Sequence, residues 1–548
     1  MRRLPAILAM FAATVVWGAE PADVIFHGGA IITMNAAQPL AGALAVRSGK
    51  IAAVGSLVEV MGLRGKKTQL RDLHGAALLP GFIDAHGHFS QQIIAGFMQN
   101  LSPPPAGSVR NIGDLQNALL AFKNEHHLKP GEWILGQGYD DSLLAERRDP
   151  TREDLDIVST ENPIFIGHIS GHLCVGNSAA LKLAGIGPDT QAPAGGVIRM
   201  SGVLEETAQS LLLSKLPRPT LQELVARVGA TQQYYAAFGL TTVQDGITAP
   251  DDLRLLQTAA QRGLLKLDVV SYPVWRSAEQ MIPTDTRSYR GHLRIAGVKM
   301  TLDGSPQAKT AFLTQPYLIP PDGRDASYRG YPILADEKVN ELVTRFAGRG
   351  WQILAHCNGD AAADQFIHAI GATGGRAKRS VIIHAQTVRE DQLDRMRDLG
   401  IIPSFFVAHT FYWGDWHRDS VLGKERAYRI SPAASAAQRG MRFTFHNDSP
   451  VVPPDMLRLL WAGVNRLSRT GDVIGSDQRV TVQQALKAVT LDAAYQYFEE
   501  DIKGSLEPGK FADMVILSEN PLIVDPRNLQ DLKVLETLKE GIIVYHRP

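Results

Sequence analysis

The stretch Leu79-Pro-Gly-Phe-Ile-Asp-Ala-His-Gly-His-Phe89 decides how the rest of the chain is interpreted. A largely apolar run over 76–83 predicts a buried strand that leads directly into His86 and His88. Side chains at positions i and i+2 of a strand point to the same side. The two imidazoles can therefore hold one metal ion at the end of the strand, and zinc favours such nitrogen ligands. A pair of polar loop histidines is the alternative that this stretch alone leaves open.

The composition is that of an ordinary globular protein. The chain has 548 residues, of which 45% are hydrophobic and 20% charged, so it can form one large α/β barrel with appendages or several domains. Lysine plus arginine and aspartate plus glutamate number 56 each, and the formal net charge is zero. Without a basic excess we expect a small-molecule substrate and no nucleic-acid partner. The sequence leaves the oligomeric state open, and a homodimer is compatible with it.

The first 19 residues have the pattern of a secretory signal peptide. Arg2 and Arg3 precede an apolar run over 4–17, and the small residues Gly18 and Ala19 follow it. This order is typical of exported proteins, and the run is too short to span a membrane. We expect residues 1–19 to be removed, the mature protein to be periplasmic or secreted, and no stable membrane anchor to remain.

Cys174 and Cys357 are the only cysteines in the chain. An exported protein can pair two cysteines, but two in a chain of this length do not make a disulfide framework. We interpret both as small buried side chains.

Short strands with turn signals are predicted at both ends of the chain, over 22–79 and again over 513–517 and 540–546. Neither terminal piece alone is long enough to bury a core. We therefore expect residues 20–79 and 500–548 to form one small composite β-sandwich module.

Between the two ends, apolar strands alternate with amphipathic helices, which predicts an α/β fold. The candidate strands are 78–83, 240–244, 267–272, 293–302, 351–355, 381–384, 401–405 and 442–446. The candidate helices are 221–238, 253–262, 336–349, 361–370, 391–399 and 432–439. About eight β/α units are the number of a closed barrel, so we predict a (β/α)8 TIM-like barrel over 80–499. The stretch at about 97–217 interrupts the alternation and predicts an inserted α+β subdomain.

Titratable side chains end several of the predicted strands. They are His86, His88, Lys299, His356, His384 and Asp448. Barrel enzymes carry their active-site residues at the carboxyl ends of strands. Each histidine alone can be a hydrogen-bonded core residue, but a random scatter of 16 histidines would not end successive strands. Together these residues indicate a metal centre.

The chain resembles the amidohydrolase superfamily, in the amidohydrolase-3 branch that contains the YtcJ-like enzymes and the N-substituted formamide deformylases. The resemblance covers essentially the whole mature chain. It rests on motifs at 80–88, 239–245, 298–305, 356–360 and 506–513, and within the insert at 135–141, 150–156, 171–172 and 177–181. As a set these motifs are highly specific.

The resemblance implies two divalent ions. One would be bound by His86, His88 and Asp448, and the second by His356 and His384. Lys299 would be carboxylated by carbon dioxide, and its carbamate would bridge the ions. Histidine-rich ligation favours zinc, but iron, manganese and cobalt fit the same ligands.

The chemistry of Lys299 supports this assignment. A free ammonium would repel two divalent ions, whereas its carbamate is an anion with two oxygen donors. The alternative is an ordinary lysine at the end of a strand, paired with Asp303.

The predicted activity is hydrolysis of a carbon–nitrogen bond in an amide or an N-acyl or N-formyl amine. A metal ion lowers the pKa of water from about 15.7 to about 7 and so activates it as a nucleophile. Asp448 would take the proton as general base and deliver it to the leaving nitrogen as general acid; a turn aspartate is its alternative reading. The same site could act on cyclic amides, carbamates or esters. A non-catalytic ligand-binding barrel is a further alternative, but such a relative is expected to lack Asp448 or a ligand.

Three residues are candidate substrate contacts. His172 matches a family position that faces the active site. Tyr139 and His409 are candidates to bind substrate or shape the pocket, although an aromatic lid that packs on itself explains them equally well.

The chain departs from the family pattern near these positions. Ser170 stands where aspartate is common, His168 replaces a residue that is not histidine, and His446-Asn447 precede Asp448 where Gly-Ser is usual. These departures leave the ligand set intact and concern the specificity of the pocket.

Overall fold

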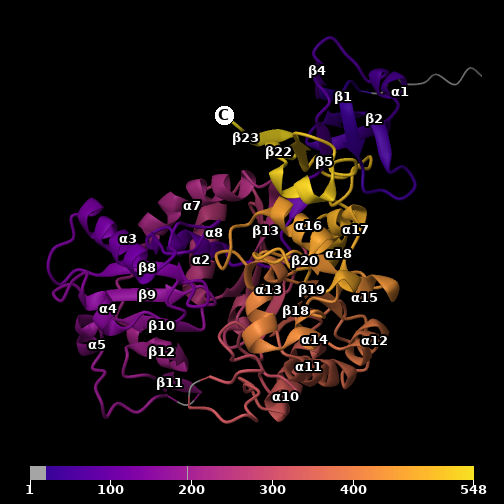
Figure 1. The fold of residues 1–548 in the computed structure, drawn as a ribbon. Helices are drawn as coiled ribbons and strands as arrows, with labels where there is room; N and C mark the ends of the chain where they lie inside the picture. Colours follow the sequence, from indigo (N-terminus) through magenta and orange to yellow (C-terminus); the bar gives the residue numbers. More distant parts are fainter. Residues whose placement is uncertain (1–19, 194, 322) are drawn as a thin grey trace, which may run out of the picture.

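The computed structural model describes residues 20–193, 195–321 and 323–548 (Figure 1). The predicted signal peptide lies outside these residues. The described chain is an α/β protein with sheets of eight, six, four and five strands. No helix within the described ranges is both long and apolar enough to cross a membrane.

Strands from both ends of the chain form the eight-stranded sheet, in the order β23-β22-β21-β5-β1-β2-β3, with β4 beside β1. The strands are β1 (Val24–Ile32), β2 (Leu40–Arg47), β3 (Lys50–Gly55), β4 (Gln69–Asp72), β5 (Ala77–Pro80), β21 (Met514–Leu517), β22 (Val534–Lys539) and β23 (Ile542–His546). Antiparallel pairing of β5 with β21 joins the two ends, which lie together at the top of Figure 1. The apolar residues Phe26, Leu44, Leu78 and Met514 pack together there. The composite of the two termini is therefore present as one sheet, which we call the terminal sheet, and the sandwich stays a prediction.

The strand predicted over 78–83 is in fact two strands. β5 ends at Pro80 in the terminal sheet, whereas β6 (Phe82–Ile83) pairs in parallel with β13 (Leu240–Thr248). Gly81 alone separates them, and a Cβ at Gly81 would lie 2.4 Å from Cγ2 of Thr241. The apolar pattern continues through Gly81 because both strands are buried, so the pattern could not reveal the change of sheet.

Two parallel sheets form the centre of the molecule. The first is β15-β14-β13-β6 and the second is β16-β17-β18-β19-β20. The strands not yet given are β14 (Asp268–Pro273), β15 (Leu293–Ile295), β16 (Gly297–Thr301), β17 (Gln352–Cys357), β18 (Val381–His384), β19 (Ile402–Phe405) and β20 (Thr444–Phe445). The strand predicted over 293–302 divides at Ala296, and a parallel bridge between Val274 and Lys299 links the two sheets.

Helices cover these strands close to the predicted positions. They are α7 (Leu221–Ala236), α8 (Pro250–Gln261), α10 (Asp336–Gly348), α11 (Asp360–Gly371), α12 (Glu390–Leu399) and α15 (Ala433–Gln438). In α10, Val339, Leu342, Val343 and Phe346 are buried, at the spacing of one apolar helix face. The other helices of this part are α2 (Phe89–Ala95), α9 (Ala278–Met281), α13 (His409–Trp416), α14 (Lys424–Ala427), α16 (Met456–Asn465), α17 (Val482–Ala488) and α18 (Leu491–Gln496).

A mixed sheet of six strands lies beside the parallel sheets, in the order β11-β12-β10-β9-β8-β7. Its strands are β7 (Gln99–Asn100), β8 (Ile134–Tyr139), β9 (Ile164–His168), β10 (Leu173–Gly176), β11 (Gly196–Ile198) and β12 (Val203–Glu206). Its helices are α3 (Ile112–Glu125), α4 (Arg152–Asp156), α5 (Ser178–Leu183) and α6 (Ser210–Leu213), and α1 (Leu57–Met61) belongs to the terminal sheet. Cys174 in β10 and Cys357 in β17 are both free and buried, so the disulfide alternative does not hold.

Candidate metal centre

The residues that the sequence singled out as metal ligands lie at the carboxyl ends of the parallel strands. His86 and His88 follow β6, Asp448 follows β20, and His384 is the last residue of β18. His356 is the penultimate residue of β17, and its ring centroid is 4.6 Å from that of His384. All of these side chains are buried.

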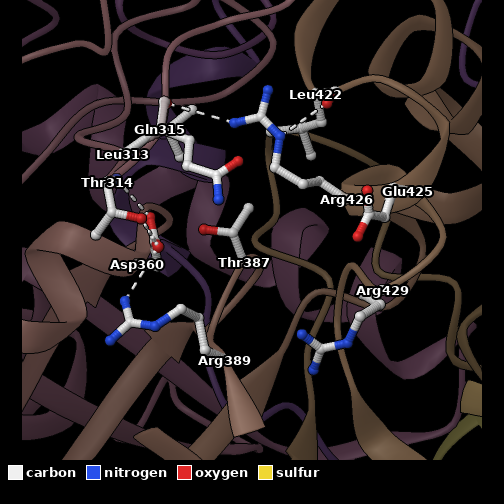
Figure 2. Close-up of a pocket in the computed structure, with 10 residues that line it drawn as sticks. All are labelled: Leu313, Thr314, Gln315, Asp360, Thr387, Arg389, Leu422, Glu425, Arg426 and Arg429. Carbon is white, nitrogen blue, oxygen red and sulfur yellow. Dashed lines mark hydrogen bonds and ion pairs between the residues drawn. The ribbon is translucent and has the colours of Figure 1, made fainter. Parts of the chain in front are cut away.

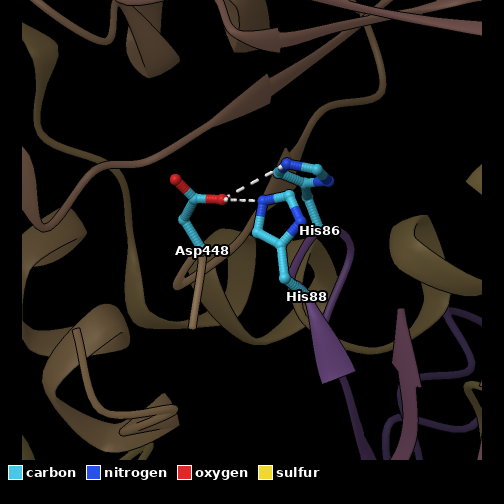
Figure 3. Close-up of side chains that lie close together, drawn as sticks. All are labelled: His86, His88 and Asp448. Atoms are coloured by element: carbon cyan, nitrogen blue, oxygen red, sulfur yellow. Dashed lines mark ion pairs between the residues drawn. The ribbon is translucent and has the colours of Figure 1, made fainter. Parts of the chain in front are cut away.

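Asp448 lies at the middle of the group. Its Oδ1 is 3.3 Å from Nε2 of His86 and 3.2 Å from Nε2 of His88, as Figure 3 shows. Its Oδ2 is 3.9 Å from Nε2 of His384. The three imidazoles therefore direct the same ring nitrogen at one carboxylate.

The other ring nitrogen of each predicted ligand histidine is already in a hydrogen bond. The Nδ1 pairs are His86 with Gln244 Oε1 (2.5 Å), His88 with Gly246 O (2.7 Å), His356 with Asp303 Oδ1 (3.1 Å) and His384 with His446 Nε2 (3.3 Å). An oxygen that accepts from Nδ1–H fixes the neutral tautomer and leaves the Nε2 lone pair for a metal ion. The first three of these histidines have such an oxygen.

Electrostatics at Asp448 also favours a cation. Its Oδ1 is buried and has no hydrogen-bond partner within the described residues, although two ring nitrogens are near. Lone pairs on Nε2 would repel this oxygen, and a buried unpaired carboxylate is costly. A divalent ion would relieve both, and the donor set of imidazole nitrogens and one carboxylate is one that such ions prefer. The residues present therefore fit a bound metal ion.

The protonation states agree with this conclusion. Burial lowers the pKa of His86 to about 3, and Lys299 adds to the effect, so its imidazole is neutral. Burial alone would raise the pKa of Asp448, but Nε2–H groups of His86 and His88 directed at it would outweigh burial and hold that pKa well below its ordinary value, and a metal ion in their place acts in the same direction. A neutral imidazole and an ionised carboxylate are the forms that bind metal ions.

Lys299 is buried in β16 next to His86. Its Nζ is 3.1 Å from Nε2 of His86, and burial lowers its pKa to about 7. Asp303 does not pair with it, since that carboxylate contacts Nδ1 of His356 and accepts backbone N–H groups such as that of Asn358. The alternative of an ordinary Lys299–Asp303 ion pair is therefore wrong.

His172 reaches toward the ligands from the turn between β9 and β10. Its ring centroid is 5.9 Å from that of His356, and its Nδ1 is 3.1 Å from Oε2 of Glu206. Burial would lower the pKa of His172, but Glu206 outweighs it and raises that pKa. Glu206 has φ 48° and ψ −122°, a conformation that residues other than glycine rarely adopt and that is often stored at functional sites.

The other two candidate substrate contacts, His409 and Tyr139, differ in their distance from the ligands. His409 is buried 6.0 Å from the ring of His384, on α13, and its Nδ1 has no partner among the described residues. Tyr139 is not brought to the ligands. Its hydroxyl donates to Asp149 at 3.0 Å, and its ring packs in the apolar core of the six-stranded sheet, because its side chain faces that core from the end of β8.

Sequence reasoning assigned no role beside the ligands to Gln244 or Glu206, and it named Asp303 only as an alternative partner of Lys299. Gln244 and Asp303 fall inside the motifs at 239–245 and 298–305, which was the available signal for both. Glu206 has no such signal, since only the fold brings it to His172.

A surface cavity lies beyond the ends of β17 and β18 but is lined by none of the six predicted ligands. Figure 2 shows Asp360 in an ion pair with Arg389, and Arg426 bonded to main-chain carbonyls. Its arginines are balanced by nearby carboxylates, including Glu425 in the lining and Glu390, which binds Arg429. We assign no part of the chemistry to this cavity.

The family model described as "Amidohydrolase family" matches residues 69–545. Among curated proteins, an N-substituted formamide deformylase from Arthrobacter pascens is 26% identical, over 96% of this chain and 98% of the relative. A Bacillus subtilis protein named as an amidohydrolase, YtcJ, is 27% identical, over 95% of this chain and 99% of the relative.

Among solved structures, an uncharacterised metal-dependent hydrolase from Pyrococcus horikoshii has a TM-score of 0.72 and 25% identity, covering 96% of this chain and all of the other. The family model covers most of the chain, and the donor set described above suits a metal ion. The chain belongs to the amidohydrolase family and is a metal-dependent amidohydrolase.

Proposed function

We propose that the protein hydrolyses the carbon–nitrogen bond of an amide or an N-acyl or N-formyl amine, with Asp448 as general base and general acid. The observation that carries the proposal is the unpartnered Oδ1 of Asp448 among the Nε2 atoms of His86 and His88. A pair of divalent ions, zinc in the first instance, would supply an activated water and polarise the carbonyl of the substrate.

His86, His88 and Asp448 would hold one ion, and His356 and His384 the other. Burial favours the neutral amine of Lys299, whose pKa is about 7. A neutral amine nitrogen can attack the carbon of carbon dioxide and lose a proton, which gives an anionic carbamate with two oxygen donors. This chemistry supports Lys299 as the bridge between the two ions.

Asp448 is suited to carry the proton. Its carboxylate is ionised, and Oδ1 is free to accept a proton from the attacking water. As the carbon–nitrogen bond breaks, the same group can return that proton to the leaving nitrogen, so the carboxylate is regenerated.

The substrate would lie between the ligands and two further imidazoles. His172, held through Nδ1 by Glu206, can contact the substrate through Nε2, and His409 would line the opposite wall. Tyr139 can act only indirectly, by shaping the sheet that carries His172. The same site could act on cyclic amides, carbamates or esters, which the screen below includes.

Two further proposals concern the whole chain. The two parallel sheets would close into one TIM-like barrel, supported by the hydrogen bond from Asp448 N to His86 O at 3.2 Å between the ends of β20 and β6. Removal of residues 1–19 and export are tested by mass spectrometry of the protein from the periplasmic fraction.

The experiment that tests the function is a substrate screen on metal-reconstituted protein. N-formyl amines, N-acyl amines, N-acyl amino acids, cyclic amides and esters are assayed in parallel, and the N-formyl and N-acyl amines are expected to be turned over fastest. Metal analysis should find close to two divalent ions per chain. Turnover of esters alone, or purified protein that reproducibly takes up no metal, would overturn the proposal.

A further inference from the structure

His384 differs from the other predicted ligand histidines in the partner of its Nδ1. Its partner is another imidazole, Nε2 of His446 at 3.3 Å, and Nδ1 of His446 is in turn 2.9 Å from Oγ of Ser404. His446 and Ser404 are both fully buried. Ser404 Oγ has no other hydrogen-bond partner in the described part of the chain. The three side chains form a linear series of hydrogen bonds that ends at Ser404, which we call the His384–His446–Ser404 chain.

The direction of this chain is not fixed by its members. The carbonyl oxygen of Gly246 and the carboxylate of Asp303 can only accept, so His88 and His356 must donate from Nδ1. Gln244 is fixed as well, because its Nε2 donates to Ala85 O at 2.8 Å and leaves Oε1 to accept from His86. An imidazole and a hydroxyl can each donate or accept, so the protons of the His384–His446–Ser404 chain can run either way.

Each direction has a different consequence for His384. If Ser404 donates to His446 Nδ1, then His446 donates from Nε2 to His384 Nδ1, and His384 carries its proton on Nε2. That form has no lone pair on Nε2 for a metal ion. In the opposite direction His384 donates from Nδ1 and Nε2 is free, whereas the Ser404 hydroxyl proton loses its only acceptor among the described residues.

We propose that His446 is a positioning residue whose hydrogen bonds reverse direction when His384 binds a metal ion, so that Nδ1 replaces Nε2 as the protonated nitrogen on both rings. The inference rests on the proposed metal centre. His384 loses the proton on Nε2, and His446 gains one on Nδ1, so the number of protons is unchanged. The proton between the two rings moves from His446 Nε2 to His384 Nδ1. Both rings stay neutral in both states, and Ser404 keeps its own proton.

The reversal costs free energy, and the other predicted ligand histidines can bind a metal ion without such a reversal. Loading His384 leaves the Ser404 hydroxyl as an acceptor only, inside the protein, where an unpaired donor is unfavourable. We therefore infer that the ion held by His356 and His384 is bound more weakly than the ion held by His86, His88 and Asp448.

The direct test is nitrogen-15 NMR of full-length protein labelled at histidine, with and without zinc. The His446 signals are identified as those absent from His446→Phe. We expect Nε2 to be the protonated nitrogen of His446 in metal-free protein and Nδ1 to be protonated after zinc is added. The same protonated nitrogen in both states would overturn the proposal, and this measurement does not require the variant to be active.

Chelator competition supplies the second test. His446→Phe removes the acceptor that holds His384 with Nε2 free. Loss of this orientation should outweigh the removal of the Ser404 cost, so the ion held by His356 and His384 should bind about 10- to 100-fold less tightly. His417→Phe is the matched control, because His417 is also fully buried and lies next to none of the six predicted ligands. Its metal affinity should equal that of the wild type.

The cobalt(II) absorption spectrum should change in His446→Phe and not in His417→Phe. Unchanged affinity and spectrum in His446→Phe would contradict the positioning role of His446 but not the proposed function. Failure of the wild type to bind two ions would instead contradict the proposed function.

Discussion

Two buried groups of charged side chains occupy opposite ends of the parallel strands and are built on opposite principles. At the carboxyl ends lies the metal centre, where Asp448 Oδ1 has no hydrogen-bond partner among the described residues and Lys299 Nζ is 3.1 Å from Nε2 of His86. At the other end lies a second group, which we call the ionic cluster. Its members are Asp268, Arg294, Glu499, Lys503, Asp513 and Lys539.

Every charge in the ionic cluster has a partner of opposite sign. Lys539 is 3.0 Å from both Asp268 and Asp513, and Lys503 pairs with Asp268 and with Glu499 at 3.0 Å. Lys539 and Asp513 belong to the terminal sheet or its border, whereas Asp268 begins β14, so the cluster ties that sheet to the parallel strands.

A buried group that stabilises the fold can thus be told apart from a buried group that reacts. Burying a charge is unfavourable unless it is paired, and in the ionic cluster each charge has an opposite charge beside it, although Arg294 Nε and Glu499 Oε2 make no hydrogen bond among the described residues. In the metal centre no charge of opposite sign in the described residues pairs with Asp448, whose Oδ1 lies among imidazole nitrogens without a hydrogen bond. A group left incomplete by the fold is completed by something that binds, whereas one that is complete serves the fold.

The largest effect is expected at Asp448. Asp448→Asn keeps the size of the side chain but removes the group that accepts and returns the proton, so turnover should fall by about 10²- to 10⁴-fold. The imidazoles remain, so metal content measured by elemental analysis should stay close to that of the wild type. An Asn variant with full turnover would remove Asp448 from the chemistry.

Lys299→Ala should lose both activity and metal. The variant removes the nitrogen that would carry the bridge, so elemental analysis should find fewer ions per chain and activity should fall in parallel. Small carboxylates such as formate or acetate are expected to restore part of the activity by supplying two oxygen donors. Full activity and full metal content without them would exclude the carbamate.

The ionic cluster should respond in stability and not in metal content. Lys539→Met leaves Asp268 and Asp513 with one partner fewer, and the free energy of unfolding should drop by about 3–5 kcal/mol, as for other broken buried pairs. Denaturant unfolding measures this. Lys66→Met is the control, because Lys66 is exposed and should change stability by no more than about 0.5 kcal/mol. Loss of metal in Lys539→Met would contradict the conclusion that the ionic cluster serves stability and not metal binding.

The smallest effect is a change in the acid dependence of stability. Burial would raise the pKa of Asp268, but Lys503 and Lys539 outweigh it and lower that pKa far below 3.8. A lowered folded-state pKa adds stability that is present above pH 3.8 and is lost as the pH falls further. Stability measured from pH 5 downward should therefore decline less steeply in Lys539→Met than in the wild type, and an equal slope would contradict this.

The strands, and the gathering of the candidate ligands near their carboxyl ends, could be predicted because both follow local rules. Residues 381–384, for example, are an apolar run that ends in His384, and the structure has the same strand. The divisions at Gly81 and Ala296 were missed because the apolar pattern shows that a segment is buried but not which sheet buries it. Those two divisions are determined by tertiary packing.

The surroundings of the ligands depended on the fold in the same way. Glu206 is the last residue of β12 and meets His172 only because β12 pairs with β10. Tyr139 pairs with His168 of β9, four residues before His172, yet its side chain packs into the sheet's own core. His446 was recognised as a departure from the family pattern, but its partner Ser404 could not be identified without the pairing of β19 with β20.

The single glycine between β5 and β6 has a consequence for protein engineering. Because Gly81 is the only residue between the terminal sheet and the strand that leads to His86, the catalytic part cannot be excised with a flexible joint at that point. A shortened enzyme would need a new amino terminus directly against the metal-binding strand. Insertions that leave activity intact belong instead in exposed connections such as the one around Gly131, where an added side chain would meet nothing within 4 Å.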